Sequence, residues 1–118
     1  MFVAGMSTKA EVEQFLKYFK TKLSVFGVVF TNREKNLDTL VALELTTANR
    51  SQFLQELRVD DYYKGPSQDY NNGPELWEFG KKIKQKEVYI KITIGHSNRP
   101  VICISFHIAE RVLKYPFK

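Results

Sequence analysis

The last third of the chain alternates between apolar and polar residues with a period of two. The alternating runs are 87–95 and 100–108, and a short polar turn separates them. Such alternation, rich in Ile and Val, is typical of half-buried strands. The turn, with its Gly and Pro, predicts an antiparallel hairpin. Its polar face carries six side chains that can do chemistry: Tyr89, Lys91, Thr93, Cys103, Ser105 and His107.

The apolar positions also predict the register of this hairpin. A slip of one residue would turn every side chain to the opposite face, so we expect Ile94 to oppose Ile102. The polar pairs would then be Thr93–Cys103, Lys91–Ser105 and Tyr89–His107. Because opposed Cβ atoms lie ~5 Å apart, a phenol, an imidazole and an ammonium group would share one patch. The next register of correct parity would separate Tyr89 from His107.

The first half of the chain has the apolar spacing of helices. A helix begins at the capping box 8–11 and ends at Gly27. A short strand is expected at 28–30. The segment 37–45 fits a helix or a strand, and we interpret it as a short helix. A further helix is expected to begin at the two threonines that open the segment 46–57.

The segment between the helices and the hairpin contains a long loop and one more strand. Residues 61–74 hold two Pro, two Gly and four Asn or Asp, and we expect no regular structure there. Residues 75–80 alternate again, with Glu78 on the polar face. A tight lysine turn at 84–87 would place Glu78 opposite Thr93, about 13 Å along the strand from Tyr89. We therefore expect Glu78 to reach the hairpin site only with a bulge, a different register or a strong twist.

These elements predict an α+β fold, in which N-terminal helices pack on one face of an antiparallel sheet and leave the other face open. The length of 118 residues suits a single domain spanning 1–118. No apolar run is long enough to span a membrane, and the first residues are too short for a signal peptide. We therefore expect a cytoplasmic protein.

Charge and composition narrow the possible chemistry. The single cysteine excludes an internal disulfide, and the two histidines, His96 and His107, lack metal-ligand spacing, so no metal site is expected. Cys103 is expected to be an inert filler in mid-strand. The net charge of +5 admits a polyanionic partner. A lysine cluster at 81–86, which includes Lys82, fits either a solvated turn or a phosphate-binding edge.

Four blocks of the C-terminal half carry a family resemblance. They are Asp-Tyr-Tyr-Lys at 61–64, Leu-Trp-Glu at 76–78, Glu-Val-Tyr-Ile-Lys-Ile at 87–92 and Val-Ile-Cys-Ile-Ser-Phe-His at 101–107. In order, spacing and chemistry, these blocks resemble the motility quorum-sensing regulator (MqsR) family of bacterial toxins. The helical first half offers no specific motif.

The resemblance implies a toxin of a type II toxin–antitoxin pair with a RelE-like fold. Such proteins are metal-independent endoribonucleases that need no cofactor, cleave mRNA and are blocked by a cognate antitoxin protein. The family's functional positions correspond to Lys64, Glu78, Tyr89 and His107. The best-known members have Gln at the position of Glu78 and Lys at that of His107.

These residues fit metal-free RNA cleavage, in which the 2′-hydroxyl attacks the neighbouring phosphorus. Glu78 is the natural base, and His107 is the natural acid, because an imidazole has an ordinary pKa of ~6.5. Tyr89 would orient the phosphate or share the proton transfer. The candidate cations are Lys64 and Lys91, and the candidate stacking residues for unpaired bases are Tyr63 and Tyr70.

Two other interpretations remain open from the sequence. The polar sheet face would also suit a non-enzymatic module that binds RNA or a protein, with salt-dependent RNA binding and no cleaved product. A structural or inhibitor-like domain would leave this face merely solvated.

Overall fold

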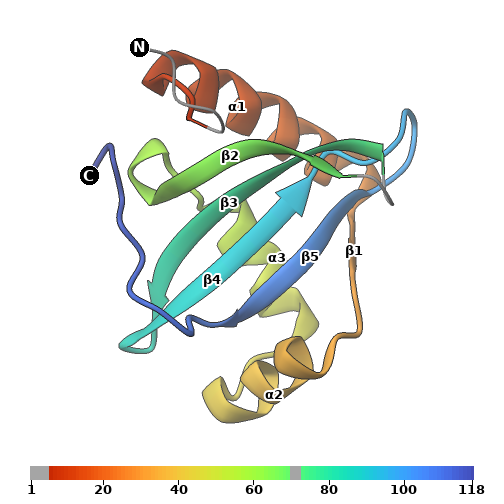
Figure 1. Cartoon of the computed structure of the whole chain (residues 1–118). Helices are drawn as coiled ribbons and strands as arrows, with labels where there is room; N and C mark the ends of the chain where they lie inside the picture. The colour runs from red at the N-terminus through yellow and green to blue at the C-terminus, as the bar shows by residue number, and fades with distance from the viewer. Residues whose placement is uncertain (1–5, 70–72) are drawn as a thin grey trace.

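The computed structural model describes residues 6–69 and 73–118, which form helices packed on a five-stranded sheet (Figure 1). The elements are α1 (Lys9–Phe26), β1 (Val28–Phe30), α2 (Glu34–Leu43), α3 (Thr47–Gln55), a 3-10 turn η1 (Val59–Asp61), β2 (Tyr62–Asp69), β3 (Gly73–Ile83), β4 (Lys86–Thr93) and β5 (Val101–Ile108). Within these two ranges, no helix combines the length and the hydropathy that a membrane-spanning segment needs.

The sheet has the strand order β1-β5-β4-β3-β2. Strands β2 to β5 are antiparallel neighbours, whereas β1 runs parallel to β5. The predicted α+β class is confirmed, but the expectation of a wholly antiparallel sheet is wrong. The parallel pair forms because the chain leaves α1 at Gly27, beside the start of β5. There the Val101 N–H donates to the Gly27 carbonyl at 3.1 Å.

The predicted helices are confirmed, and side-chain caps mark the starts of α1 and α3. The Thr8 side chain caps α1 in a capping box, and the helix ends at Gly27, whose φ of 80° lies in the left-handed region. The Thr46 side chain caps α3 in the same way. The segment 37–45 forms most of α2, which begins three residues earlier, at Glu34.

The core lies between one face of the sheet and the helices α1 and α3 (Figure 1). The Phe15 ring of α1 stacks on Trp77 of β3 with centroids 4.2 Å apart, and Phe79 lies on the same side. This packing uses the predicted apolar stripe of α1. The helix α2 lies beside β5 at the edge of the sheet. The helices therefore leave the opposite face of the sheet uncovered.

The expectation that residues 61–74 have no regular structure is wrong, because β2 pairs with β3 over much of this range. The pairing has three register shifts, which accommodate the turn-forming residues. Pro66 is tolerated because β2 is an edge strand, where a missing N–H costs no sheet hydrogen bond. At Gly65, with φ of 115°, a Cβ atom would lie 2.9 Å from the Leu76 carbonyl oxygen. Tyr70 lies outside the described residues.

The pairing of β4 with β5 confirms part of the predicted register. The pairs Tyr89–His107 and Lys91–Ser105 form as expected. Past Lys91 a bulge shifts the register by one residue, so the pairs there are Ile92–Cys103 and Thr93–Ile102 rather than Thr93–Cys103. Because of this shift, the side chains of residues 101–104 point to the opposite faces of the sheet from those expected. Val101 and Cys103 are fully buried in the core, and Ile102 and Ile104 are only partly buried.

Side chains of α2 bond the edge of β5 where β1 has ended. The Asn36 amide donates to the Ile104 carbonyl at 3.0 Å and accepts from the Phe106 N–H at 3.0 Å. The Thr39 hydroxyl accepts from the Ile108 N–H at 3.0 Å. These bonds replace a strand neighbour, because unpaired backbone groups at a buried edge are costly. They also hold the bulge, and with it the strand that carries His107.

Asn36→Ala is expected to lower the free energy of unfolding by about 2–3 kcal/mol. Asn36 is 1% exposed, and its loss would leave the buried Phe106 N–H without an acceptor. Urea unfolding measures the change. Asn32→Ala, at an exposed position, is the matched control and should shift the midpoint little. Equal stability of the two variants would contradict the role of Asn36.

Candidate active site on the open sheet face

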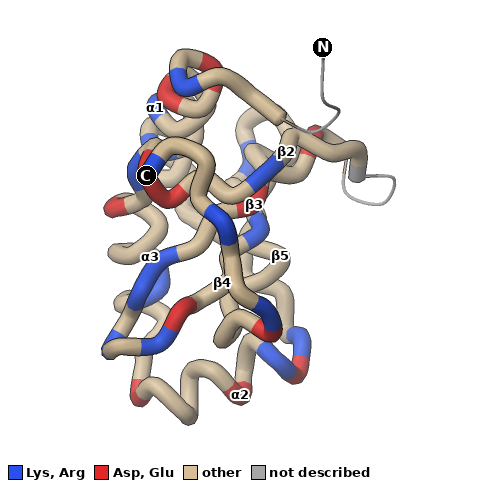
Figure 2. The backbone as a smooth tube through the Cα atoms, turned by 60° about the vertical axis from the view of Figure 1, so that its left-hand side comes forward, with Lys and Arg blue, Asp and Glu red and all other residues tan. Residues whose placement is uncertain are grey.

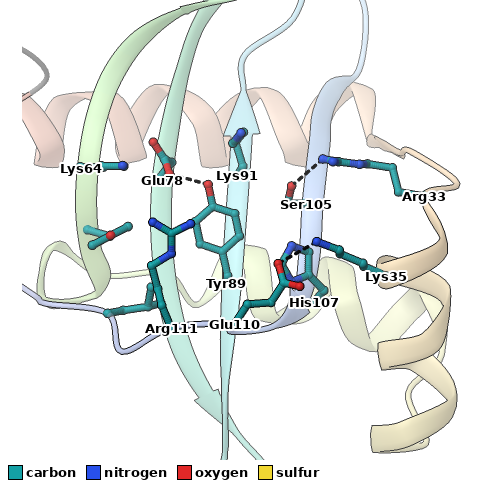
Figure 3. A pocket seen from close by; sticks show the side chains of 12 residues that line it. Arg33, Lys35, Lys64, Glu78, Tyr89, Lys91, Ser105, His107, Glu110 and Arg111 are labelled. Carbon is teal, nitrogen blue, oxygen red and sulfur yellow. Dashed lines mark hydrogen bonds and ion pairs between the residues drawn. The ribbon is translucent and has the colours of Figure 1, made fainter.

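The open face of the sheet carries a polar cleft (Figure 3). Its walls come from strands β2 to β5, from the start of α2 and from the segment after β5. The lining residues are Arg33, Lys35, Tyr63, Lys64, Glu78, Tyr89, Lys91, Ser105, His107, Glu110, Arg111 and Leu113. The cleft therefore contains all four residues of the predicted catalytic set.

Sheet register explains how these side chains meet. One row across the strands consists of Lys64, Glu78, Lys91 and Ser105, each being the Cα partner of the next. The adjacent row on the same face consists of Gly80, Tyr89 and His107. Because alternate residues of a strand share a face, the two rows lie side by side in the cleft.

The turn between β3 and β4 differs from the predicted one. Its two central residues, Lys84 and Gln85, have left-handed φ values of 49° and 68°. A two-residue turn of this kind matches the twist of the flanking strands. It pairs Ile83 with Lys86, whereas the expected turn pairs Ile83 with Val88.

This shorter turn brings Glu78 into the site. Glu78 lies opposite Lys91 and not opposite Thr93, so the prediction that it lies far from Tyr89 is wrong. The Tyr89 hydroxyl donates a hydrogen bond to Glu78 Oε1 (Figure 3). Glu78 is 8% exposed. The structure therefore places a carboxylate, a phenol and an imidazole on three neighbouring strands.

Tyr89 lies at the centre of the cleft. Its ring is 5.3 Å from the His107 ring, centroid to centroid, and 6.5 Å from that of Tyr63 in an edge-on contact. Burial raises the pKa of Tyr89, the hydrogen bond to Glu78 raises it further, and Arg111 acts in the opposite direction. Tyr89 is therefore a neutral hydrogen-bond donor and not a base.

The His107 ring forms a hydrogen bond with the backbone at the end of its own strand, β5. Its Nδ1 lies 3.0 Å from the Ile108 carbonyl oxygen. Because a carbonyl only accepts, Nδ1 must carry a proton, and Nε2 is the nitrogen left for proton exchange in the cleft. His107 is 9% exposed, so its ring is fixed by packing as well as by this bond.

The cleft is more cationic than the sequence predicted. Lys64 and Lys91 were expected there, whereas Arg33, Lys35 and Arg111 were not. Five cationic side chains thus face two carboxylates, Glu78 and Glu110. Figure 2 shows acidic and basic residues interspersed along much of the chain, apart from the lysine cluster at 81–86. The cleft is therefore a local concentration of positive charge, suited to an anionic ligand.

Two of the three unexpected cations, Lys35 and Arg33, differ in whether a carboxylate neutralises their charge. Lys35 Nζ forms an ion pair with Glu110 Oε1 at 2.7 Å. Arg33 Nη1 donates to the Ser105 hydroxyl at 3.1 Å, and within 6–69 and 73–118 it forms no ion pair. Arg33 sits at the start of α2, which packs against β5 only in the folded chain, so no local pattern could have indicated it.

The segment after β5 completes the cleft by turning back across the sheet. The Glu87 carboxylate accepts hydrogen bonds from the Leu113 N–H at 3.3 Å and from the Tyr115 hydroxyl at 2.9 Å. The segment after β5 crosses the sheet at Gly80, where an added Cβ atom would lie 2.6 Å from Leu113 Cδ1. The missing side chain at Gly80 thus allows the crossing that carries Arg111 to the site.

Other predicted residues lie elsewhere. Tyr63 lines the cleft, but Lys82 is exposed outside it. In the lysine cluster, Lys84 donates to the Leu43 carbonyl at the end of α2, which is a structural role. Cys103 is fully buried, which raises the pKa of its thiol and agrees with an inert filler. Among the described residues no group of three or more His, Cys, Asp or Glu is placed to hold a metal ion.

The arrangement can move protons beside a bound anion. A carboxylate and an imidazole supply an acceptor and a donor, a phenol lies between them, and cations surround all three. Comparisons of the chain with models of known protein families, with curated proteins and with solved structures find no match in any of the three.

Proposed function

We propose that this protein is an endoribonuclease that cleaves mRNA in the cytoplasm without a metal ion or other cofactor. It would act as the toxin of a type II toxin–antitoxin pair, with the RelE-like fold of the MqsR family that its C-terminal half resembles. The observation that carries the proposal is the Glu78–Tyr89–His107 constellation inside a cationic cleft. A cognate antitoxin would be its protein partner.

In this reaction Glu78 takes the proton of the substrate 2′-hydroxyl. The 2′-oxygen forms a bond to phosphorus as the bond from phosphorus to the 5′-oxygen breaks. His107, protonated, gives its Nε2 proton to the departing 5′-oxygen. The products are a 2′,3′-cyclic phosphate and a 5′-hydroxyl, and no oxidant, reductant or added nucleophile is needed.

The positions of Glu78 and His107 in the sheet support their assignment as base and acid. Glu78 is on β3 and His107 on β5, with Tyr89 of β4 between them. Glu78 and His107 are two strands apart across the sheet and two residues apart along it, so their backbones lie roughly 12 Å from each other. Both side chains line the same cleft, so their functional groups can bracket one phosphate, with the Tyr89 hydroxyl beneath it.

The remaining lining residues suit the rest of the substrate. Lys64 and Lys91 flank Glu78 in the sheet row and would stabilise the charge that builds on the phosphate oxygens. Tyr63, whose ring lies edge-on to Tyr89, would stack on an unpaired base. A site that uses the 2′-hydroxyl acts on RNA and not on DNA.

Controlled expression in a bacterium tests the proposal. Growth arrest should coincide with new RNA 5′ ends that carry hydroxyl groups, found by sequencing 5′ ends before and after induction. The purified protein should make the same cuts in the presence of EDTA. Loss of cleavage in EDTA would overturn the metal-free mechanism, and salt-dependent RNA binding without cleavage would favour the binding module instead.

A further inference from the structure

We propose that single-stranded RNA crosses the cleft with a defined polarity, its 3′ side toward α2, and that Arg33 binds the phosphate next to the scissile one on that side. This inference rests on the proposed function. It adds a binding residue from the helical half of the chain and a direction for the substrate.

The polarity follows from the order of the base and the acid across the sheet. The nucleotide that supplies the 2′-hydroxyl must lie beside Glu78 on β3, and the nucleotide that keeps the 5′-oxygen must lie beside His107 on β5. The chain downstream of the cut therefore continues past β5. The next element in that direction is the start of α2.

Arg33 stands where the next phosphate would arrive. It bonds Ser105, which is on the same strand and the same face as His107, two residues away or roughly 7 Å. Ser105 is 1% exposed, so this anchor is rigid. Only one of the five guanidinium N–H donors is used in this bond, which leaves others for phosphate oxygens.

Charge balance distinguishes Arg33 from its neighbour. Lys35 also lies at the start of α2, but Glu110 already neutralises it at 2.7 Å. Arg33 has no carboxylate partner in the described part of the chain. An uncompensated guanidinium beside a substrate cleft binds phosphate in a fork geometry that Lys does not reproduce.

A phosphate-neutralisation cycle tests both parts of the inference. The substrate is a DNA oligonucleotide with one ribonucleotide at a site found by mapping the 5′ ends, so it can be cut at one bond. A neutral methylphosphonate replaces the phosphate immediately 3′ or immediately 5′ of the scissile one. Wild type and Arg33→Gln are compared by kcat/KM, with Arg99→Gln as the matched control at an exposed position outside the cleft.

The 3′ methylphosphonate should lower kcat/KM of the wild type by ~10-fold or more, the worth of a charge-assisted hydrogen bond. Arg33→Gln should lose as much on the normal substrate and nothing further on the 3′-modified one. The 5′ methylphosphonate should affect both proteins equally. Arg33→Lys should recover part of the loss, and Arg99→Gln should behave as the wild type.

Two results would overturn the inference and leave the nuclease function intact. Additive losses from Arg33→Gln and the 3′ methylphosphonate would show that the two groups do not meet. Coupling of Arg33 to the 5′ phosphate would reverse the polarity. If the wild type cuts none of these oligonucleotides, nor natural RNA, the nuclease function itself is wrong, and the inference falls with it.

Discussion

Replacement of His107 by alanine is expected to slow RNA cleavage by about 10²–10⁴-fold, the usual contribution of a general acid. His107 lies beside Tyr89 with Nε2 left for the cleft, and His96, the other histidine of the sequence, is not among the described residues that line it. The initial rate of cleavage of a single-ribonucleotide oligonucleotide measures the loss. His96→Ala is the matched control, because His96 is exposed in the turn before β5.

A modified substrate separates an acid from a merely structural residue. If a sulfur atom replaces the departing 5′-oxygen, the leaving group is a thiolate, which needs no proton to depart because a thiol has an ordinary pKa of ~8.5. The sulfur substrate should therefore restore most of the rate of His107→Ala. An equal defect on both substrates, with an unchanged urea midpoint, would show that His107 is not the acid.

Replacement of Glu78 by glutamine is expected to cause a loss of similar size, about 10²–10⁴-fold. Glutamine keeps the shape of the side chain, and its carbonyl oxygen can still accept from the Tyr89 hydroxyl. The fold should therefore survive, while the ability to take the 2′-hydroxyl proton is lost. Glu75→Gln, on the same strand but outside the cleft, is the control for the loss of one negative charge.

The same sulfur substrate serves as the second arm of this experiment. Glu78→Gln should remain slow on it, since an easier departure does not replace a missing base. Tyr89→Phe should lose less than Glu78→Gln, because it removes the hydrogen bond but leaves the carboxylate. Full activity of Glu78→Gln would show that another group is the base.

Several features of the fold and the site were predictable because they depend on short-range rules. The helix caps at Thr8 and Thr46 satisfy orphan backbone groups within one turn, so α1 and α3 begin where predicted. The period of two sorted residues 88–92 of β4 and 105–108 of β5 by face, and this placed Tyr89 opposite His107.

Other features were not predictable because distant segments decide them. The strand β2 has the composition of a loop, yet it forms because β3 offers its backbone groups along one edge. The backbone beside the bulge beyond Lys91 is bonded by Asn36 of a separate helix, which contacts Ile104 and Phe106. Neither partner is visible in the local pattern, so the buried set at 101–104 was assigned to the wrong face.

Local patterns along the chain were enough to predict the helices, the hairpin of β4 and β5, and the meeting of Tyr89 with His107. Period and capping are local properties of the chain, and they leave few alternatives. Glu78 joins them, and Arg33 and Arg111 surround them, only in the folded chain. This is because the register beyond a turn depends on the packing of the whole chain, and so does the approach of a helix or of the C-terminal segment to the sheet.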